Sequence, residues 1–143
     1  MTHPIPQGFH TVTPYFLVRD GQRFIRFLEQ AFDGELLARH DGTDGHILNA
    51  EVRVGDSVLM LGEPPEPHKP TQTMMYLYVP DADALYRRAL AAGAKATAPM
   101  EDQFYGDRAG AVQDDEGNTW WIATRKEEVP AGELERRMKA RGK

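Results

Sequence analysis

Glu51 is the carboxylate of this sequence whose position best suits proton transfer. It stands in "LNAEVRV", two residues beyond Asn49, so these two side chains would share one face of a strand. If that face borders a cleft, Glu51 is the best candidate for a general base. The alternative is a carboxylate that faces solvent or pairs with Arg53 or Arg39, as most strand carboxylates do.

Asp107 and Arg108 form a second polar pair, in the stretch "YGDRAG". The planar guanidinium of Arg108 could bind a carboxylate or phosphate of a ligand, which makes Arg108 a candidate anion anchor in a catalytic site. The alternative is a structural salt bridge that holds the loop "EDQFYGD" to a sheet. Both roles stay open at the level of the sequence, with the structural one favoured.

The histidines do not form a recognisable metal-binding pattern. His40 and His46 flank the loop "DGTDG", where Asp41 and Asp44 could form a weak metal site, but a calcium loop needs more oxygen ligands in a fixed order. The remaining histidines are expected at the surface: His3, His10 and His68. The chain has no cysteine, which excludes disulfides and thiol catalysis.

The composition of the chain argues against some kinds of binding partner. The chain has 143 residues and a formal net charge of -5, so we expect one acidic domain that does not bind nucleic acid or an anionic membrane. No apolar run approaches the roughly 20 residues that span a bilayer. The N-terminus "MTHPIPQGFH" lacks the basic start and apolar segment of a signal peptide, which predicts a cytoplasmic location.

A strand and an amphipathic helix are predicted first along the chain. Residues 12–18 are rich in β-branched and aromatic side chains and lead to Asp20, a candidate helix N-cap. Apolar residues then recur at helical spacing as far as Gly34, which is expected to cap the helix. Three further strands are predicted, over 35–41, 46–54 and 57–62.

The same order of elements recurs after the linker "EPPEPHKPTQ". A strand over 73–79 leads to Asp81 and to a helix that ends at Gly93. Three strands follow, over 95–100, 108–114 and 118–124.

Equivalent residues of the two halves are separated by nearly constant intervals. Val18 and Val79 are 61 residues apart, Gly34 and Gly93 are 59 apart, and Gly55 and Gly117 are 62 apart. We therefore infer two βαβββ modules, each of which would bury its bare sheet face against the other.

The chain is predicted to be one domain with four consecutive parts. These are module one at about 10–62, a linker at 63–72, module two at about 73–125, and a C-terminal tail at 126–143. The tail is dense in charge and predicts a solvated helix, and the alternative is an arm that lies on a partner subunit.

The repeat and the stretch "EDQFYGDRAGAVQDDEGNTWWIAT" resemble the vicinal oxygen chelate superfamily of glyoxalases, extradiol dioxygenases and bleomycin-resistance proteins, and within it the PhnB-like branch. The most specific residues are Gly106, Asp107, Arg108, Gly110, Asp114, Gly117 and Trp120. The resemblance implies an α+β fold in which two βαβββ modules form an incomplete, cleft-bearing barrel. It also implies a homodimer, since relatives of this size often build the cleft between chains.

Metal-using members of this superfamily take four ligands from the first and fourth strands of each module. Carried over to this chain, those positions fall on Thr13, Met60, Met74 and Trp121. These side chains cannot hold a divalent metal that prefers imidazole or carboxylate, so neither a metal nor another cofactor is expected. Asn49 also stands where PhnB-like relatives often have a histidine.

The resemblance further implies a cleft of apolar and aromatic character. Because side chains alternate along a strand, Trp121 would face the cleft while Trp120 and Ile122 pack beneath a helix. The predicted ligand-binding residues are Thr13, Tyr15, Met60, Met74, Tyr76, Phe104, Tyr105 and Trp121. The alternative is that these side chains simply fill the cleft.

Two functions follow from these residues. The first is a metal-independent protein that binds a small apolar or aromatic molecule in its cleft, similar to bleomycin-resistance proteins. The second is a lyase, isomerase or dioxygenase of the glyoxalase type, with Glu51 as base and Arg108 as anion anchor.

Overall fold

The computed structural model describes residues 2–65 and 69–142. The first module consists of β1 (Tyr15–Leu17), α1 (Gly21–Phe32), β2 (Glu35–Asp41), β3 (Ile47–Val54) and β4 (Ser57–Gly62). The second repeats this order with β5 (Met74–Tyr78), α2 (Ala82–Ala91), β6 (Lys95–Asp102), β7 (Asp107–Gln113) and β8 (Thr119–Arg125). The predicted α+β fold with two βαβββ modules is therefore confirmed.

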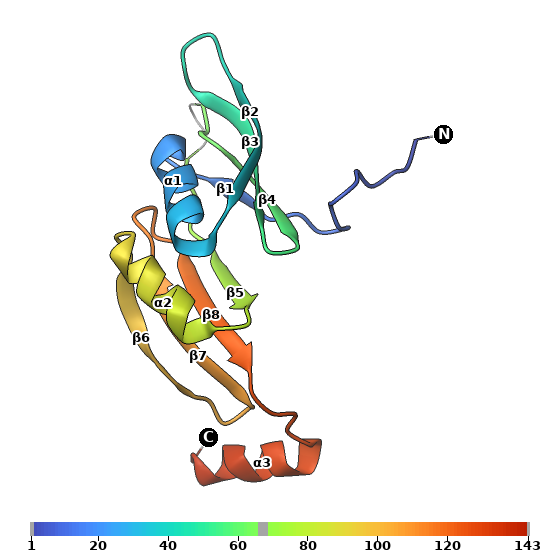
Figure 1. Cartoon of the computed structure of the whole chain (residues 1–143), viewed down its shortest axis with the longest axis vertical. Coiled ribbons are helices and arrows are strands. Elements are labelled where there is room, and N and C mark those ends of the chain that lie inside the picture. Colours follow the sequence, from blue (N-terminus) through green and yellow to red (C-terminus); the bar gives the residue numbers. More distant parts are fainter. Residues whose placement is uncertain (1, 66–68, 143) are drawn as a thin grey trace.

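Each module contains a four-stranded mixed sheet. The strand orders are β1-β4-β3-β2 and β5-β8-β7-β6, and the first strand of each module runs parallel to its neighbour while the other pairs are antiparallel. The helices α1 and α2 lie side by side along one side of the molecule, each over its own sheet (Figure 1).

Two aspartates start the helices, as the sequence predicts. The Asp20 carboxylate accepts a hydrogen bond from the backbone N–H of Arg23 at 3.0 Å, and Asp81 accepts one from Ala84 at 3.1 Å. Each carboxylate satisfies an N–H that has no partner within its helix.

The predicted role of Gly34 as the cap of α1 is wrong by one residue. Asp33 takes the left-handed conformation, with a φ of 56°, and aspartate is one of the few side chains that tolerate it. Gly34 is required for space, because a Cβ there would lie 2.9 Å from a methyl of Val52 and 2.9 Å from the Leu28 carbonyl oxygen.

Trp120 joins the cores of the two modules. It is 1% exposed, and its ring stacks on Phe16 of β1 with centroids 5.4 Å apart and an interplanar angle of 18°. Phe24 and Phe32 of α1 lie 6.4 and 5.1 Å from the same ring. The prediction that Trp120 packs beneath a helix is confirmed, and that helix belongs to the other module.

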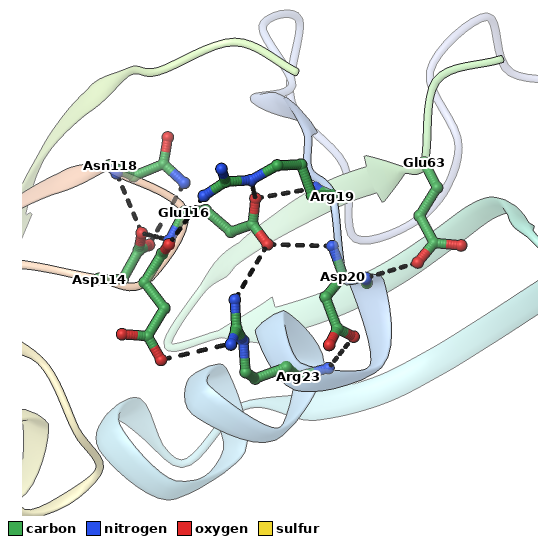
Figure 2. A network of polar contacts seen from close by, with 9 residues as sticks. Arg19, Asp20, Arg23, Glu63, Asp114, Glu116 and Asn118 are labelled. Atoms are coloured by element: carbon green, nitrogen blue, oxygen red, sulfur yellow. Dashed lines mark hydrogen bonds and ion pairs between the residues drawn. The ribbon is translucent and has the colours of Figure 1, made fainter. Parts of the chain in front are cut away.

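Two glutamates from distant segments hold the start of α1 (Figure 2). Glu116, in the turn between β7 and β8, accepts hydrogen bonds from the backbone N–H groups of Arg19 and Asp20 at 2.8 and 3.0 Å. Glu63, just after β4, accepts from Gly21 and Ile47, both at 2.7 Å. Negative charge is favourable at the N-terminus of a helix, so both glutamates stabilise the start of α1, and the contacts of Glu116 also hold the two modules together.

The C-terminal tail forms α3 (Ala131–Ala140), which lies beyond the free end of the second sheet (Figure 1). None of its described residues is buried. Arg137 donates to the carbonyl of Phe104 at 3.0 Å, and the Arg141 guanidinium lies 4.6 Å from the centre of the Phe104 ring. The solvated helix is thus present in the single chain, and the arm on a partner stays a prediction. No helix in the described part of the chain has the length and apolar character needed to cross a membrane.

Candidate ligand-binding face

The side of the first sheet that faces away from α1 carries a mixed polar and apolar surface. Tyr15 of β1 is the cross-strand partner of Met60 of β4, and Met60 is in turn the partner of Glu51 of β3, so the three side chains share this face. The hydroxyl of Tyr15, which is 45% exposed, donates to the carbonyl of Leu48 at 3.3 Å and accepts from the Asn49 amide at 3.4 Å.

Glu51 does not form the ion pairs that the sequence offered as an alternative. Arg53 pairs with Glu35, and Arg39 pairs with Asp41 at 2.9 Å. Both arginines therefore have other partners. Glu51 is half-buried beside Met60, and its carboxylate lies on the open face of the first sheet.

The corresponding face of the second sheet is aromatic. Tyr76 of β5 is the cross-strand partner of Trp121 of β8, and their rings stack with centroids 6.2 Å apart at 18°. Tyr78 follows on the same face, 5.2 Å from the Tyr76 ring. Met74, Tyr76 and Tyr78 are 64%, 39% and 64% exposed, so β5 presents three large side chains to solvent on this face.

A carboxylate lies at the hydroxyl ends of the two tyrosine rings. Asp107, at the start of β7, is 4% exposed and accepts hydrogen bonds on one oxygen from the hydroxyls of Tyr76 at 2.8 Å and Tyr78 at 2.9 Å. The Tyr105 hydroxyl lies 2.9 Å from that of Tyr76. We call these four residues the tyrosine–aspartate cluster.

The surroundings of Tyr76 and Tyr78 raise the pKa of both phenols. Burial first, and then the hydrogen bonds with Tyr105 and Asp107, raise the pKa of Tyr76 far above its ordinary value. The pKa of Tyr78 is also raised, chiefly by its hydrogen bond to Asp107. Both hydroxyls therefore remain protonated and act as donors to the carboxylate.

The cluster was missed by sequence reasoning, which treated Asp107 only as the neighbour of Arg108. The available signal was Tyr76 and Tyr78 two residues apart on one strand. Only the register of β5, β8 and β7 brings them to Asp107.

Of the two loop aromatics predicted at the mouth of the cleft, Tyr105 joins the cluster. Phe104 packs edge-on against Tyr105, with centroids 5.2 Å apart, and is covered by Arg141 after α3. The Phe104 ring thus lies between Tyr105 of the same loop and Arg141 of the C-terminal segment. Thr13 precedes β1 and is half-buried.

Arg108 projects toward α2 and away from the aromatic face. Its guanidinium donates to Asp83 of α2 at 2.8 Å and to Asp102 of β6 at 3.3 Å. The hydrogen bond from Arg108 lowers the pKa of Asp83. The expected role of Arg108 as an anion anchor in the cleft does not fit this position, whereas the structural salt bridge does.

Substituting Arg108 with glutamine should therefore make the free energy of unfolding depend less on pH between neutral and acid conditions. Because the pKa of Asp83 is lowered in the folded state, its contribution is present above the ordinary carboxyl pKa of about 4 and is lost as the pH falls through the lowered value. Urea midpoints between pH 2.5 and 7 should show a gap between wild type and Arg108→Gln that is widest at neutral pH. Arg26→Gln, on the exposed side of α1, controls for the loss of charge. An equal gap at every pH would contradict this ion-pair role.

The residues present do not fit a divalent metal. Thr13, Met60, Met74 and Trp121 offer no imidazole or carboxylate, and their cross-strand partners on the same face add a single carboxylate, that of Glu51, too few ligands for a divalent metal. Within residues 2–65 and 69–142, no three His, Asp or Glu side chains converge as metal ligands.

The histidines are placed as surface groups where the structure describes them. His46 lies 2.8 Å from the Asp44 carboxylate in the exposed β2–β3 loop, and Asp41 is engaged by Arg39. His3 and His10 are exposed, and His68 lies outside the described residues.

The two open faces belong to separate sheets, so the single chain does not close the expected cleft. The expectation that each module buries its bare sheet face against the other is wrong: the modules meet through α1, α2 and Trp120 on the helix side. Two hollows lie at other places, although Asp107 borders the second of them. One of about 190 Å³ is lined by α1 and the 114–116 turn, and a wider one borders Arg108 and Lys126.

Comparison with known proteins agrees with this architecture. Residues 8–122 match the family described as the Glyoxalase/Bleomycin resistance protein/Dioxygenase superfamily. An uncharacterized protein of Mycobacterium bovis is 32% identical over 142 residues, covering 92% of this chain and 93% of that protein.

Solved structures share the fold. TioX from Micromonospora sp. ML1 is similar with a TM-score of 0.70 and 26% identity, over 81% of this chain and 98% of that chain. TnmS3 from Streptomyces sp. CB03234, described as an antibiotic binding protein, has a TM-score of 0.67 and 20% identity, over 87% of this chain and 100% of that chain.

Proposed function

This chain belongs to the glyoxalase/bleomycin resistance protein/dioxygenase superfamily, and on that premise we propose that it binds a small apolar or aromatic molecule without a metal ion. The observation that carries the proposal is the exposed aromatic face of the second sheet, with Met74, Tyr76, Tyr78 and Trp121. Rings held in place by stacking and hydrogen bonds present a large apolar surface with little rotamer entropy to lose on binding.

A second copy of the chain would complete the site. With both open faces on the side away from the helices, a two-fold axis can place the first sheet of one chain opposite the second sheet of its partner and form two equivalent clefts. Each cleft would combine Tyr15, Met60 and Glu51 from one chain with Tyr76 and Trp121 from the other. Sedimentation of the purified protein as a dimer would support this arrangement.

The placement of this chain in the PhnB-like branch and the apolar or aromatic character of its ligand are both part of the proposal. Residues 101–124 support membership of the PhnB-like branch. TnmS3 is described as antibiotic-binding, but at 20% identity it shares only the fold with this chain, so the ligand class is argued from the side chains on the open faces. The cytoplasmic location stays a prediction.

Replacing Trp121 with alanine should weaken binding at least about tenfold, because a central aromatic anchor contributes a large share of binding energy. The measurement is a thermal-shift screen of aromatic compounds, followed by titration of the tightest binder into wild type, Trp121→Ala and Glu51→Gln. Under the proposal Glu51→Gln, which keeps the size of the side chain, lowers the affinity less than Trp121→Ala does. Equal affinity for wild type and Trp121→Ala would show that this face is not the site.

Glu51 is the basis of a second candidate function, a lyase, isomerase or dioxygenase of the glyoxalase type. The observation in its favour is a carboxylate on the open face whose neighbouring arginines pair elsewhere. Turnover of a bound compound that is lost in Glu51→Gln while binding persists would favour this candidate. Arg108 has no part in it, since it lies on the other face of the second sheet.

A further inference from the structure

The tyrosine–aspartate cluster has a defined direction of hydrogen bonding. A phenol carries one proton, and Tyr76 and Tyr78 both direct theirs to Asp107. Tyr105 must then donate to the oxygen of Tyr76. Tyr76 and Tyr78 therefore donate directly to the Asp107 carboxylate, and Tyr105 is linked to it through the Tyr76 hydroxyl.

Asp107 is a buried carboxylate held by phenols, and the positive charge that acts on this cluster is that of Arg125, near Tyr78. In the part of the chain that the structure describes, the ion pairs within 4.0 Å do not include its carboxylate. Its cross-strand partner Arg125 has its guanidinium 3.7 Å from Glu128. A buried charge normally has a charged partner, so neutral phenols are an unusual complement.

Three rings lie in a row near this charge, and the hydroxyls of Tyr76 and Tyr78 reach it directly. Tyr78, Tyr76 and Trp121 follow one another across β5 and β8, with neighbouring centroids 5.2 and 6.2 Å apart. Donation to a carboxylate increases the electron density of a phenol ring, which strengthens its attraction for a cation at its face. The face thus combines an apolar surface with a buried carboxylate at its edge.

We propose that this face selects ligands that carry a cationic nitrogen, an ammonium or amidinium group, which lies over the rings of Tyr76, Tyr78 and Trp121 with Asp107 as the countercharge. The inference rests on the proposed function and narrows its ligand class from apolar or aromatic to aromatic and cationic.

The test uses compounds of similar size and different charge. Phenethylammonium, 2-phenylethanol and 3-phenylpropanoate are titrated into the full chain at pH 7, with binding followed by shifts of backbone amide resonances. The cation should bind about tenfold more tightly than the alcohol, and the anion more weakly than both. The largest shifts should fall on β5 and β8.

Variants assign the preference to the cluster. Asp107→Asn should reduce the preference for phenethylammonium over 2-phenylethanol to near unity, whereas Asp102→Asn, an exposed carboxylate on the helix side, should leave it unchanged. Tyr78→Phe keeps the ring and removes one donor, so it provides a milder variant if Asp107→Asn fails to fold. It should reduce the preference only in part.

The possible failures are distinguishable. If the alcohol binds this face as tightly as the cation, the charge selection is wrong and the proposed function stands. A preference for the cation that persists in both Asp107→Asn and Tyr78→Phe also overturns the inference. If none of the three compounds shifts resonances of either open face at 10 mM, about the weakest affinity worth measuring, both proposals fall.

Discussion

Replacing Trp120 with alanine should lower the free energy of unfolding by about 3 to 5 kcal/mol, the usual cost of removing a fully buried large aromatic side chain. The indole contacts Phe16, Phe24 and Phe32 of the other module, so its loss opens a cavity at the junction as well as removing apolar contact. Urea unfolding followed by circular dichroism measures the change. The expected loss is a large part of the roughly 5 to 15 kcal/mol by which a typical domain is stable.

Trp121 provides a matched control one residue away. Its side chain lies on the opposite face of β8 and is only half-buried, so Trp121→Ala should cost under about 1 kcal/mol. The two variants should thus separate stability from binding, with Trp120→Ala affecting the first and Trp121→Ala the second. Equal losses of stability in both variants would contradict the assignment of the two faces.

Replacing Asp114 with alanine is expected to be nearly as costly, with a loss of about 3 to 4 kcal/mol. Its carboxylate accepts from the backbone N–H groups of Glu116 and Asn118 at 2.9 and 3.0 Å, from the Asn118 amide at 3.3 Å and from the Trp120 indole at 2.8 Å. All of these bonds are buried, and each unsatisfied donor costs about 1 to 3 kcal/mol, part of which relaxation recovers.

Asp114→Asn tests whether this acceptor role explains the loss. Asparagine keeps one oxygen for the backbone donors of the β7–β8 turn but presents an amide N–H₂ to the Trp120 indole, so its loss of stability should be intermediate. Comparison of urea midpoints for wild type, Asp114→Asn and Asp114→Ala gives the order. If Asp114→Asn is as stable as wild type, the indole bond contributes little.

Much of the fold could be predicted from local patterns, because each pattern reports a local physical preference. The helix starts at Asp20 and Asp81 follow from the fit of a short carboxylate to free N–H groups. The repeat intervals predicted two equal modules. The end of α1 could not be predicted in this way. Gly34 was predicted to cap the helix, but Asp33 takes the left-handed conformation, and Gly34 is needed because a Cβ would collide with Val52.

The candidate site could be predicted only in part. Alternation along a strand placed Trp121 opposite Trp120. Residue identity alone was enough to exclude metal-ligating side chains at the four superfamily positions, which are Thr13, Met60, Met74 and Trp121. The pairing of Arg108 with Asp83 depends on the position of α2 over the second sheet, which strand patterns do not specify.

The sequence by itself determined the modules, the helix caps and the chemical character of the strand faces, because these depend on residues close together in the chain. Only the tertiary structure decided that Trp120 joins the two cores, that Glu116 holds the start of α1, and that Tyr76, Tyr78 and Tyr105 surround Asp107. These contacts join segments about 30 to 100 residues apart, and sheet register and module packing, rather than local preference, bring such segments together.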